Sequence, residues 1–290
     1  DMTPDGASSR RGVGPNLLLA WPALALFVLF VGPLVVILAV SLFRRVQSAF
    51  FEPAVVLDNY ARALEPFYLE RLWVTVAIAS GAALVCLVIG LPFTYLLARL
   101  PRRRQVKYLV LVLASLSLSE VIVAFSWSLM LSRTSGVSNA LVWLGLLPSP
   151  QAWSPGLAAV LLALVFIALP LTVLTFYPPV SRLNPELVEA AATLGASPLR
   201  AFMTVVVPVL RRAVAGGLAL VFIFVLGAYV IPQSLGRPAQ WTLPVQITDQ
   251  AILKSNLPLA AALAVVLLAA GAAVSIAILA FGLKRQRSEA

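Results

Sequence analysis

Six long apolar segments divide this chain and restrict its fold more than any other feature of the sequence. Each is long enough for a helix to cross the hydrocarbon core of a bilayer, which takes about 20 predominantly apolar residues. A helix is favoured in lipid because it satisfies its own backbone hydrogen bonds. We therefore predict an all-α polytopic membrane protein with six transmembrane helices. The predicted spans are residues 17–42, 72–98, 108–131, 157–177, 213–235 and 259–283.

The composition favours a membrane over an aqueous environment. Hydrophobic residues make up 61% of the 290 residues and charged residues only 11%, whereas a soluble domain carries about 25% charged residues. The formal net charge of +10 comes from basic residues between the apolar segments, without the interleaved aromatic residues of single-strand nucleic-acid binders. We therefore expect contacts with membrane lipids and none with nucleic acid, and one membrane domain over residues 17–283.

The placement of lysine and arginine predicts which loops face the cytoplasm. Alternate flanks of the spans differ roughly twofold in basic residues, and cytoplasmic loops are the basic ones in membrane proteins. The cytoplasmic parts are therefore predicted to be residues 1–16, 99–107, 178–212 and 284–290. Arg44 and Arg45, which directly follow the first span on the outer side, run against this rule.

Prolines lie within or at the ends of several predicted spans. They are Pro22, Pro33, Pro92, Pro170 and Pro232. A proline inside a helix removes one backbone donor and clashes with the preceding turn. A single one predicts a harmless kink, whereas five together favour a bundle that bends or encloses a path.

The predicted cytoplasmic loop 178–212 contains signals for two short helices. Asn184 is a good N-cap, Pro185 suits the first helical position, and Glu186 favours the positive end of the helix. Gly195 suits the left-handed residue that ends a helix, and Ser197-Pro198 then repeats the cap-and-start chemistry. Such a module either simply connects two spans or docks a soluble partner, and its local chemistry leaves both interpretations open.

The segment Glu189-Ala190-Ala191-Ala192-Thr193-Leu194-Gly195, followed by Val207-Pro208, resembles the EAA loop of binding-protein-dependent ABC importer permeases. This resemblance implies a type I ABC importer permease fold. It also implies that the 185–200 part of the loop couples the chain to a separate ATPase subunit. The residues expected to serve this coupling are Glu186, Glu189, Ala190, Ala191, Gly195 and Arg200.

Further segments resemble the permeases of spermidine/putrescine-type importers. They are residues 58–62, 90–95, 226–232 and 257–263. The resemblance implies a small solute, polyamine-like or another cationic compound. Val123, however, stands where many relatives carry arginine, and related permeases carry opines, phosphonates, ferric iron or thiamine. The substrate is therefore less firmly predicted than the family.

The sequence contains no Gly-x-x-x-x-Gly-Lys-Ser/Thr segment of the kind that cradles phosphates. We therefore predict a transport subunit that is not itself an enzyme and has no cofactor or metal of its own, while ATP and Mg²⁺ bind to a partner ATPase. By resemblance, the other partners are a second, different permease subunit and a periplasmic or lipid-anchored substrate-binding protein. The implied location is the bacterial inner membrane.

The alternative function is that of an ion-coupled secondary transporter or a channel. Secondary transporters place several ionisable groups along their path, whereas only Glu120 carries a charge within the six predicted spans. An intramembrane enzyme would need a nucleophile–base pair or a metal-ligand cluster, and the predicted spans offer neither. A purely structural subunit would leave the loop motif without a purpose.

Four residues are candidates for the substrate path or its gate. They are Glu120, Trp127, Tyr229 and Pro232. Glu120 falls near the middle of the third predicted span, where a carboxylate is costly unless it has a partner, a proton or a ligand. It is either satisfied by neighbours such as Ser117 or faces the path, where it and Trp127, two helical turns on, would attract a cation. Tyr229 and Pro232 mark the outer end of the fifth predicted span, where a broken helix would line the path.

Overall fold

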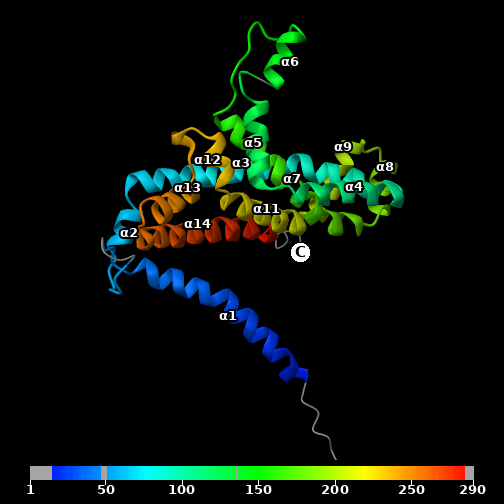
Figure 1. Ribbon diagram of the computed structural model, residues 1–290. Coiled ribbons are helices and arrows are strands. Elements are labelled where there is room, and N and C mark those ends of the chain that lie inside the picture. The colour runs from blue at the N-terminus through cyan, green and yellow to red at the C-terminus, as the bar shows by residue number, and fades with distance from the viewer. Residues whose placement is uncertain (1–14, 47–50, 135, 285–290) are drawn as a thin grey trace, which may run out of the picture.

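The computed structural model describes residues 15–46, 51–134 and 136–284, and their regular structure is almost entirely helical (Figure 1). The α-helices are α1 (Pro15–Ser41), α2 (Asp58–Ala63), α3 (Pro66–Ala98), α4 (Arg102–Leu116), α5 (Glu120–Met130), α6 (Val137–Trp143), α7 (Leu157–Ser181), α8 (Glu186–Thr193), α9 (Pro198–Ala201), α10 (Val207–Val209), α11 (Arg211–Leu226), α12 (Val230–Leu235), α13 (Leu243–Thr248) and α14 (Leu257–Lys284). Shorter segments of other helical geometry are Phe202–Val206, Pro238–Gln240 and Asp249–Leu253. Within the described residues the only β-type pairing is one bridge between Arg44 and Glu52.

A bundle of α3, α7, α11 and α14 forms the body of the molecule (Figure 1). Its main core consists of small and branched side chains such as Ala82, Ala163 and Val221, none of which is more than 1% exposed. Helices α8 and α9 lie at one end of the bundle and α2 and α13 at the other (Figure 1). These are called the α8 end and the α13 end below. Helix α5 rises from the side of the bundle and α6 lies beyond its tip (Figure 1).

Helix α1 leaves the bundle and crosses open space (Figure 1). It packs against α14, and near its C-terminal end the Asn59 amide donates to the carbonyls of Ser41 (2.9 Å) and Phe43 (2.8 Å). Its apolar side chains are otherwise uncovered, and Trp21 and Phe30 are 75% and 74% exposed. A helix that is apolar all round needs lipid or another subunit to cover it.

Four helices are long and apolar enough to cross a membrane unaided, and they coincide with the first, second, fourth and sixth predicted segments. The third predicted span is not one helix, because α4 and α5 meet at an angle of 92° across 117–119. The fifth predicted span is also interrupted, since α11 ends at Leu226 and α12 begins at Val230. Serines at the first break and glycine at the second are weak helix formers. If each bent helix pair counts as one span, the described residues contain up to six spans, and the fifth predicted span is broken near its outer end.

The predicted prolines do not cause these breaks. Helix α1 runs through Pro22 and Pro33, α3 runs through Pro92, and α7 runs through Pro170. Each proline removes one backbone donor, and a membrane helix tolerates such a loss where neighbouring groups compensate. Only Pro232 lies near a break, in the short α12.

Close approach of helices in the bundle depends on a glycine of α11. A side chain at Gly217 would collide with the ring of Phe176 on α7. Both residues are buried, so the absent side chain makes room for the aromatic ring. Small residues at helix contacts are a regular feature of membrane bundles, because they let backbones approach closely.

Candidate functional site

The α8 module, defined here as residues 184–204, begins with the cap that the sequence predicts. The side-chain oxygen of Asn184 accepts a hydrogen bond from the Glu186 backbone N–H at 3.0 Å, while its amide nitrogen donates to the Glu186 carboxylate at 3.1 Å. The backbone N–H groups of Val188 and Glu189 both donate to the Pro185 carbonyl. The first turn of α8 therefore has partners for donors that a helix start leaves open.

The C-terminal end of α8 is closed by Gly195. This residue has φ of +83°, in the left-handed region. Its N–H donates to the Ala192 carbonyl at 2.9 Å, and the N–H of Ala196 donates to the Ala191 carbonyl at 3.0 Å. This pair of bonds is the Schellman motif, which ends a helix where glycine adopts positive φ. The predicted helix stop is present in the structure.

A second helix follows at once. The Ser197 hydroxyl accepts from the Arg200 N–H at 3.4 Å, and Pro198 is the first residue of α9. Residues 198–209 form a continuous helical segment whose axis makes an angle of 80° with that of α11, and the bend lies near Leu210. The sequence-predicted helix–turn–helix is therefore present.

The residues predicted to serve coupling all lie on this module. Glu186, Glu189, Ala190 and Gly195 are exposed, and Ala191 is half-buried. Arg200 is exposed at the start of the second helix, and its carbonyl accepts from the Thr204 hydroxyl at 2.7 Å. The acidic first turn of α8 therefore faces outward, where a partner can reach it.

Sequence reasoning missed four exposed apolar side chains on the same module. They are Leu187, Leu194, Leu199 and Met203, with 44%, 88%, 70% and 59% exposure. Exposed apolar groups gathered on a short segment mark an interaction surface more often than isolated ones do. Their large apolar side chains, in a loop predicted to lie outside the membrane, were the signal available in the sequence.

A compact apolar cluster joins the α8 module to the bundle. Val188 of α8 packs against a group that includes Phe176 of α7 and Phe202, which follows α9. The Phe202 ring also meets the Tyr95 ring of α3 edge-on, with 5.2 Å between their centroids. Displacement of the α8 module therefore acts directly on the ends of α3 and α7.

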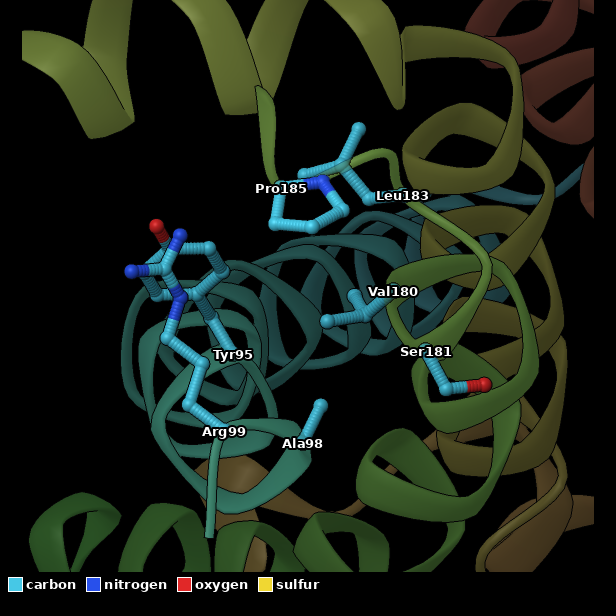
Figure 2. A pocket seen from close by; sticks show the side chains of 7 residues that line it. All are labelled: Tyr95, Ala98, Arg99, Val180, Ser181, Leu183 and Pro185. Carbon is cyan, nitrogen blue, oxygen red and sulfur yellow. The ribbon is translucent and has the colours of Figure 1, made fainter. Parts of the chain in front are cut away.

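A cleft of about 430 Å³ opens beside this cluster, between the ends of α3 and α7 and the segment that enters α8 (Figure 2). Arg99 lies over the ring of Tyr95, with its guanidinium carbon 4.4 Å from the ring centroid. Leu183 and Pro185 face this pair from the other side of the cleft (Figure 2). The cleft therefore adds a positively charged edge to the surface around α8.

Glu120 lies at the break between α4 and α5 as the first residue of α5, inside the third predicted span, which bends by 92° at this point. Its carboxylate accepts from the backbone N–H of Ile231, in the first turn of α12, at 3.4 Å. Trp127 shares the inward side of α5, and its ring meets that of Phe166 on α7 at 6.0 Å. These contacts give both residues a packing role.

The other two predicted path residues lie at the second break. Tyr229 directly precedes α12 and is half-buried, and Pro232 is buried within α12. Tyr229 borders a pocket of about 130 Å³. Asp249 and Trp241 also line this pocket, and sequence reasoning missed both because they come from separate segments.

Comparison with known proteins agrees with this architecture. Residues 90–287 match the family model described as "Binding-protein-dependent transport system inner membrane component". The chain is 31% identical over 219 residues to the spermidine/putrescine transport system permease protein PotB of Escherichia coli (strain K12), covering 76% of this chain and 78% of that protein. It is 26% identical over 285 residues to the inner membrane ABC transporter permease protein YdcU of the same organism, covering 89% and 90% of the two chains.

Solved structures share the fold. The chain superimposes on the crystal structure of a bacterial ABC transporter involved in the import of the acidic polysaccharide alginate with a TM-score of 0.67, at 19% identity over 94% of this chain and 95% of that one. An inward-facing structure of the MetNI methionine ABC transporter gives a TM-score of 0.51 at 19% identity, over 74% and 98% of the two chains. The type I importer permease fold predicted from the sequence is thereby confirmed. This chain belongs to the family of binding-protein-dependent transport system inner membrane components, and it is a multi-pass permease subunit of an ABC importer.

Proposed function

We propose that this chain is one permease half of an importer that moves polyamines or similar small cations, driven by ATP hydrolysis in a separate subunit. The observation that carries the coupling part is the α8 module, an exposed short helix capped at both ends by its own residues. A helix fixed in this way transmits a push without unwinding. Its exposed leucines supply apolar contact area for a docked ATPase, and Glu189 supplies a charge.

The proposed movement starts at α8 and enters the bundle through Val188 and Phe202. These side chains pack against Phe176 of α7, while Tyr95 of α3 packs against Phe202. Close-packed side chains transmit displacement because they have no free volume into which to move. Closure of the ATPase would therefore shift the ends of α3 and α7 and open the path at the other end.

The proposed orientation places the α8 end in the cytoplasm and the α13 end outside. Basic residues gather around the α8 end, as in the run Arg102-Arg103-Arg104 at the start of α4, and cytoplasmic loops carry such an excess. Both chain termini are then cytoplasmic, and the α13 end receives solute from a soluble or lipid-anchored binding protein. An alkaline-phosphatase fusion at Arg104 should be inactive, and activity there would contradict the orientation.

The proposed substrate class follows from the relatives named for spermidine and putrescine, among them the E. coli protein. The second permease half is expected to be a different chain. Cells that carry this transporter should accumulate labelled putrescine or spermidine, and ATP depletion should stop the uptake. If the cells accumulate neither polyamine, the proposed substrate class is wrong, while the assignment of the chain to its family still holds.

Charge reversal at Glu189 tests the coupling assignment. Glu189→Lys should reduce both the ATPase recovered with the purified chain and the uptake rate by about tenfold or more, because it replaces an attractive contact by a repulsive one. Glu189→Gln keeps the shape of the side chain and a hydrogen-bond acceptor, so it should reduce ATPase recovery and uptake less than Glu189→Lys does. Normal ATPase recovery and uptake in Glu189→Lys would show that α8 is only a connector.

A further inference from the structure

The pocket at the α13 end, here called the Asp249 pocket, has walls from three separate parts of the chain. Tyr229 directly precedes α12 and Gln233 lies in it, Trp241 follows the short helical turn after α12, and Thr248 ends α13 while Asp249 begins the helical segment that follows. A carboxylate and two aromatic rings therefore border one cavity.

The carboxylate of the Asp249 pocket is paired with a lysine of the same loop. Asp249 Oδ2 lies 2.7 Å from the ammonium nitrogen of Lys254. The Asp249 side chain is 27% exposed and that of Lys254 is 52% exposed, so the lysine is the outer partner of the two. Water reaches the half-exposed lysine and weakens its attraction to the carboxylate. Lys254 can therefore leave Asp249 at little cost.

We propose that the Asp249 pocket binds a primary ammonium group of the transported solute, and that Lys254 occupies the same carboxylate when no solute is present. This inference rests on the proposed cationic substrate and adds its binding site on this chain. An ammonium ion at Asp249 gains a charge-assisted hydrogen bond and lies in a pocket that the aromatic residues Tyr229 and Trp241 line, and aromatic rings attract cations. The Lys254 side chain carries the same functional group, so it stands in for the solute.

The size of the pocket fits such a ligand. Its volume is about 130 Å³, close to that of the roughly 150 Å³ cavity known to take benzene, a molecule with six heavy atoms. Putrescine also has six heavy atoms. The pocket can therefore hold one end or most of a short diamine, whereas a spermidine molecule would extend out of it.

A tethered competitor also suits a transport site. Lys254 is five residues from Asp249 and returns to the carboxylate whenever a solute departs. The site therefore releases cargo readily instead of trapping it. Glu120 is a poorer candidate for the solute, because its carboxylate already accepts the Ile231 N–H.

The decisive experiment measures binding of radiolabelled putrescine to the purified, complete transporter without its binding protein, by equilibrium dialysis. Asp249→Asn should raise the Kd about tenfold, the loss expected for a hydrogen bond to a charged group. Lys254→Met should lower the Kd about threefold, because it removes the competing cation. Lys254→Arg retains the competitor and should bind like the wild type. Uncharged 1,4-butanediol should not displace the label.

The opposite directions of the two effects separate this site from a structural ion pair. If the ion pair is only structural, Asp249→Asn and Lys254→Met should each weaken putrescine binding, and the double variant should recover it. The proposal instead predicts that the double variant binds putrescine as weakly as Asp249→Asn. Absence of binding in both wild type and Lys254→Met would also overturn the site.

Trp241 provides a second, independent test. Its indole N–H is buried without an acceptor among the described residues, so the ring brings no hydrogen bond of its own to the pocket. Trp241→Phe should therefore keep most of the affinity, while Trp241→Leu should weaken it about threefold to tenfold. Equal loss in both variants would contradict a role for the ring face.

Two further outcomes distinguish this site from the proposed function. If the wild-type transporter takes up no putrescine or other polyamine, the proposed function is wrong and the proposed site is wrong as well. If uptake is normal and the Kd of Asp249→Asn is unchanged, the site alone is wrong. Weaker docking of the binding protein in Asp249→Asn, with an unchanged Kd for putrescine, would assign the pocket to protein docking and would also overturn the proposal.

Discussion

The hydrogen bonds that shape the α8 module join residues two to five positions apart, as between Asn184 and Glu186 or between Ala191 and Ala196. Those that shape the α13 end join distant segments. The Leu243 N–H donates to the Thr75 hydroxyl, 168 positions away, and the Gln250 amide donates to the Tyr68 hydroxyl, 182 positions away. The α8 module is thus held together locally and stays exposed, while the α13 end is assembled from α2, α3, α12, α13 and α14.

This difference indicates two kinds of mechanical part. A locally capped helix keeps its shape when a partner binds or leaves, which suits a docking element. A region built from long-range contacts changes when the helices beneath it move, which suits a site that must open and close. The predictions below test this contrast, from the largest expected effect to the smallest.

Gly195 should be the most sensitive position of the α8 module. Gly195→Val forces a β-branched side chain into the left-handed region, which costs an ordinary residue about 1–2 kcal/mol and a branched one more. We expect loss of the ATPase from the purified complex and uptake below about a tenth of the wild-type rate, because the turn re-forms differently. No atom lies within 4 Å of a side chain added here, so the effect is one of backbone conformation.

Gly195→Asn is the matched control for that substitution. Asparagine tolerates the left-handed conformation and also occurs at this helix-ending position, so this variant should retain most of the uptake and most of the ATPase. Equal failure of Gly195→Asn and Gly195→Val would mean that the partner needs a bare backbone at 195 and not only the turn.

Gly216 and Gly217, adjacent in α11, test the rigidity of the bundle that α8 acts on. A methyl group at Gly217 would collide with the Phe176 ring, whereas one at Gly216 meets nothing within 4 Å. Gly217→Ala should lower the free energy of unfolding by about 1–3 kcal/mol, the usual cost of overpacking. Gly216→Ala should raise it by about 0.5–1 kcal/mol through helix propensity. Thermal unfolding of the detergent-purified chain compares the two, and equal midpoints would mean that the Phe176 contact is loose.

The contrast between the two ends also explains what the sequence could predict. The α8 module could be predicted from Asn184, Gly195 and Ser197, because helix capping depends on residues only a few positions apart. The Asp249 pocket has no such local signal, since Tyr229 and Asp249 are brought together only by the packing of α12 and α13. The break beside Glu120 was missed because apolar segments lie on both sides of Ser117 and Ser119, and hydropathy averaged over such a stretch does not distinguish a straight helix from a bent one.

Thr75 and Thr94, both buried in α3, test the long-range bonds of the α13 end. The Thr75 hydroxyl accepts from the Leu243 N–H at 2.7 Å, whereas the Thr94 hydroxyl only donates to the Gly90 carbonyl of its own helix. Thr75→Val should lower the free energy of unfolding by about 1–3 kcal/mol, because it leaves the buried Leu243 N–H without an acceptor. Thr94→Val should lower the free energy of unfolding by less than about 1 kcal/mol, since the Gly90 carbonyl retains its helical hydrogen bond. Hydrogen exchange should localise the Thr75→Val effect to α13, and equal changes in both variants would contradict a link that holds the α13 end.

The smallest effect is expected at Glu120, and it sharpens the distinction between the Glu120 and Asp249 carboxylates. Glu120 accepts the Ile231 N–H at 3.4 Å, and Gln keeps an oxygen in that position, so Glu120→Gln should change the free energy of unfolding by less than about 0.5 kcal/mol. Its Kd for putrescine should stay within about twofold of the wild-type value, because the proposed ammonium site is the Asp249 carboxylate, whereas the Glu120 carboxylate accepts the Ile231 N–H. Glu120→Ala leaves the Ile231 N–H without its acceptor and should destabilise α12, which hydrogen exchange of that helix would detect. A tenfold rise in Kd for Glu120→Gln in a correctly assembled transporter would instead place Glu120 on the solute path, one of the two interpretations that the sequence left open, and would make the two carboxylates parts of one site.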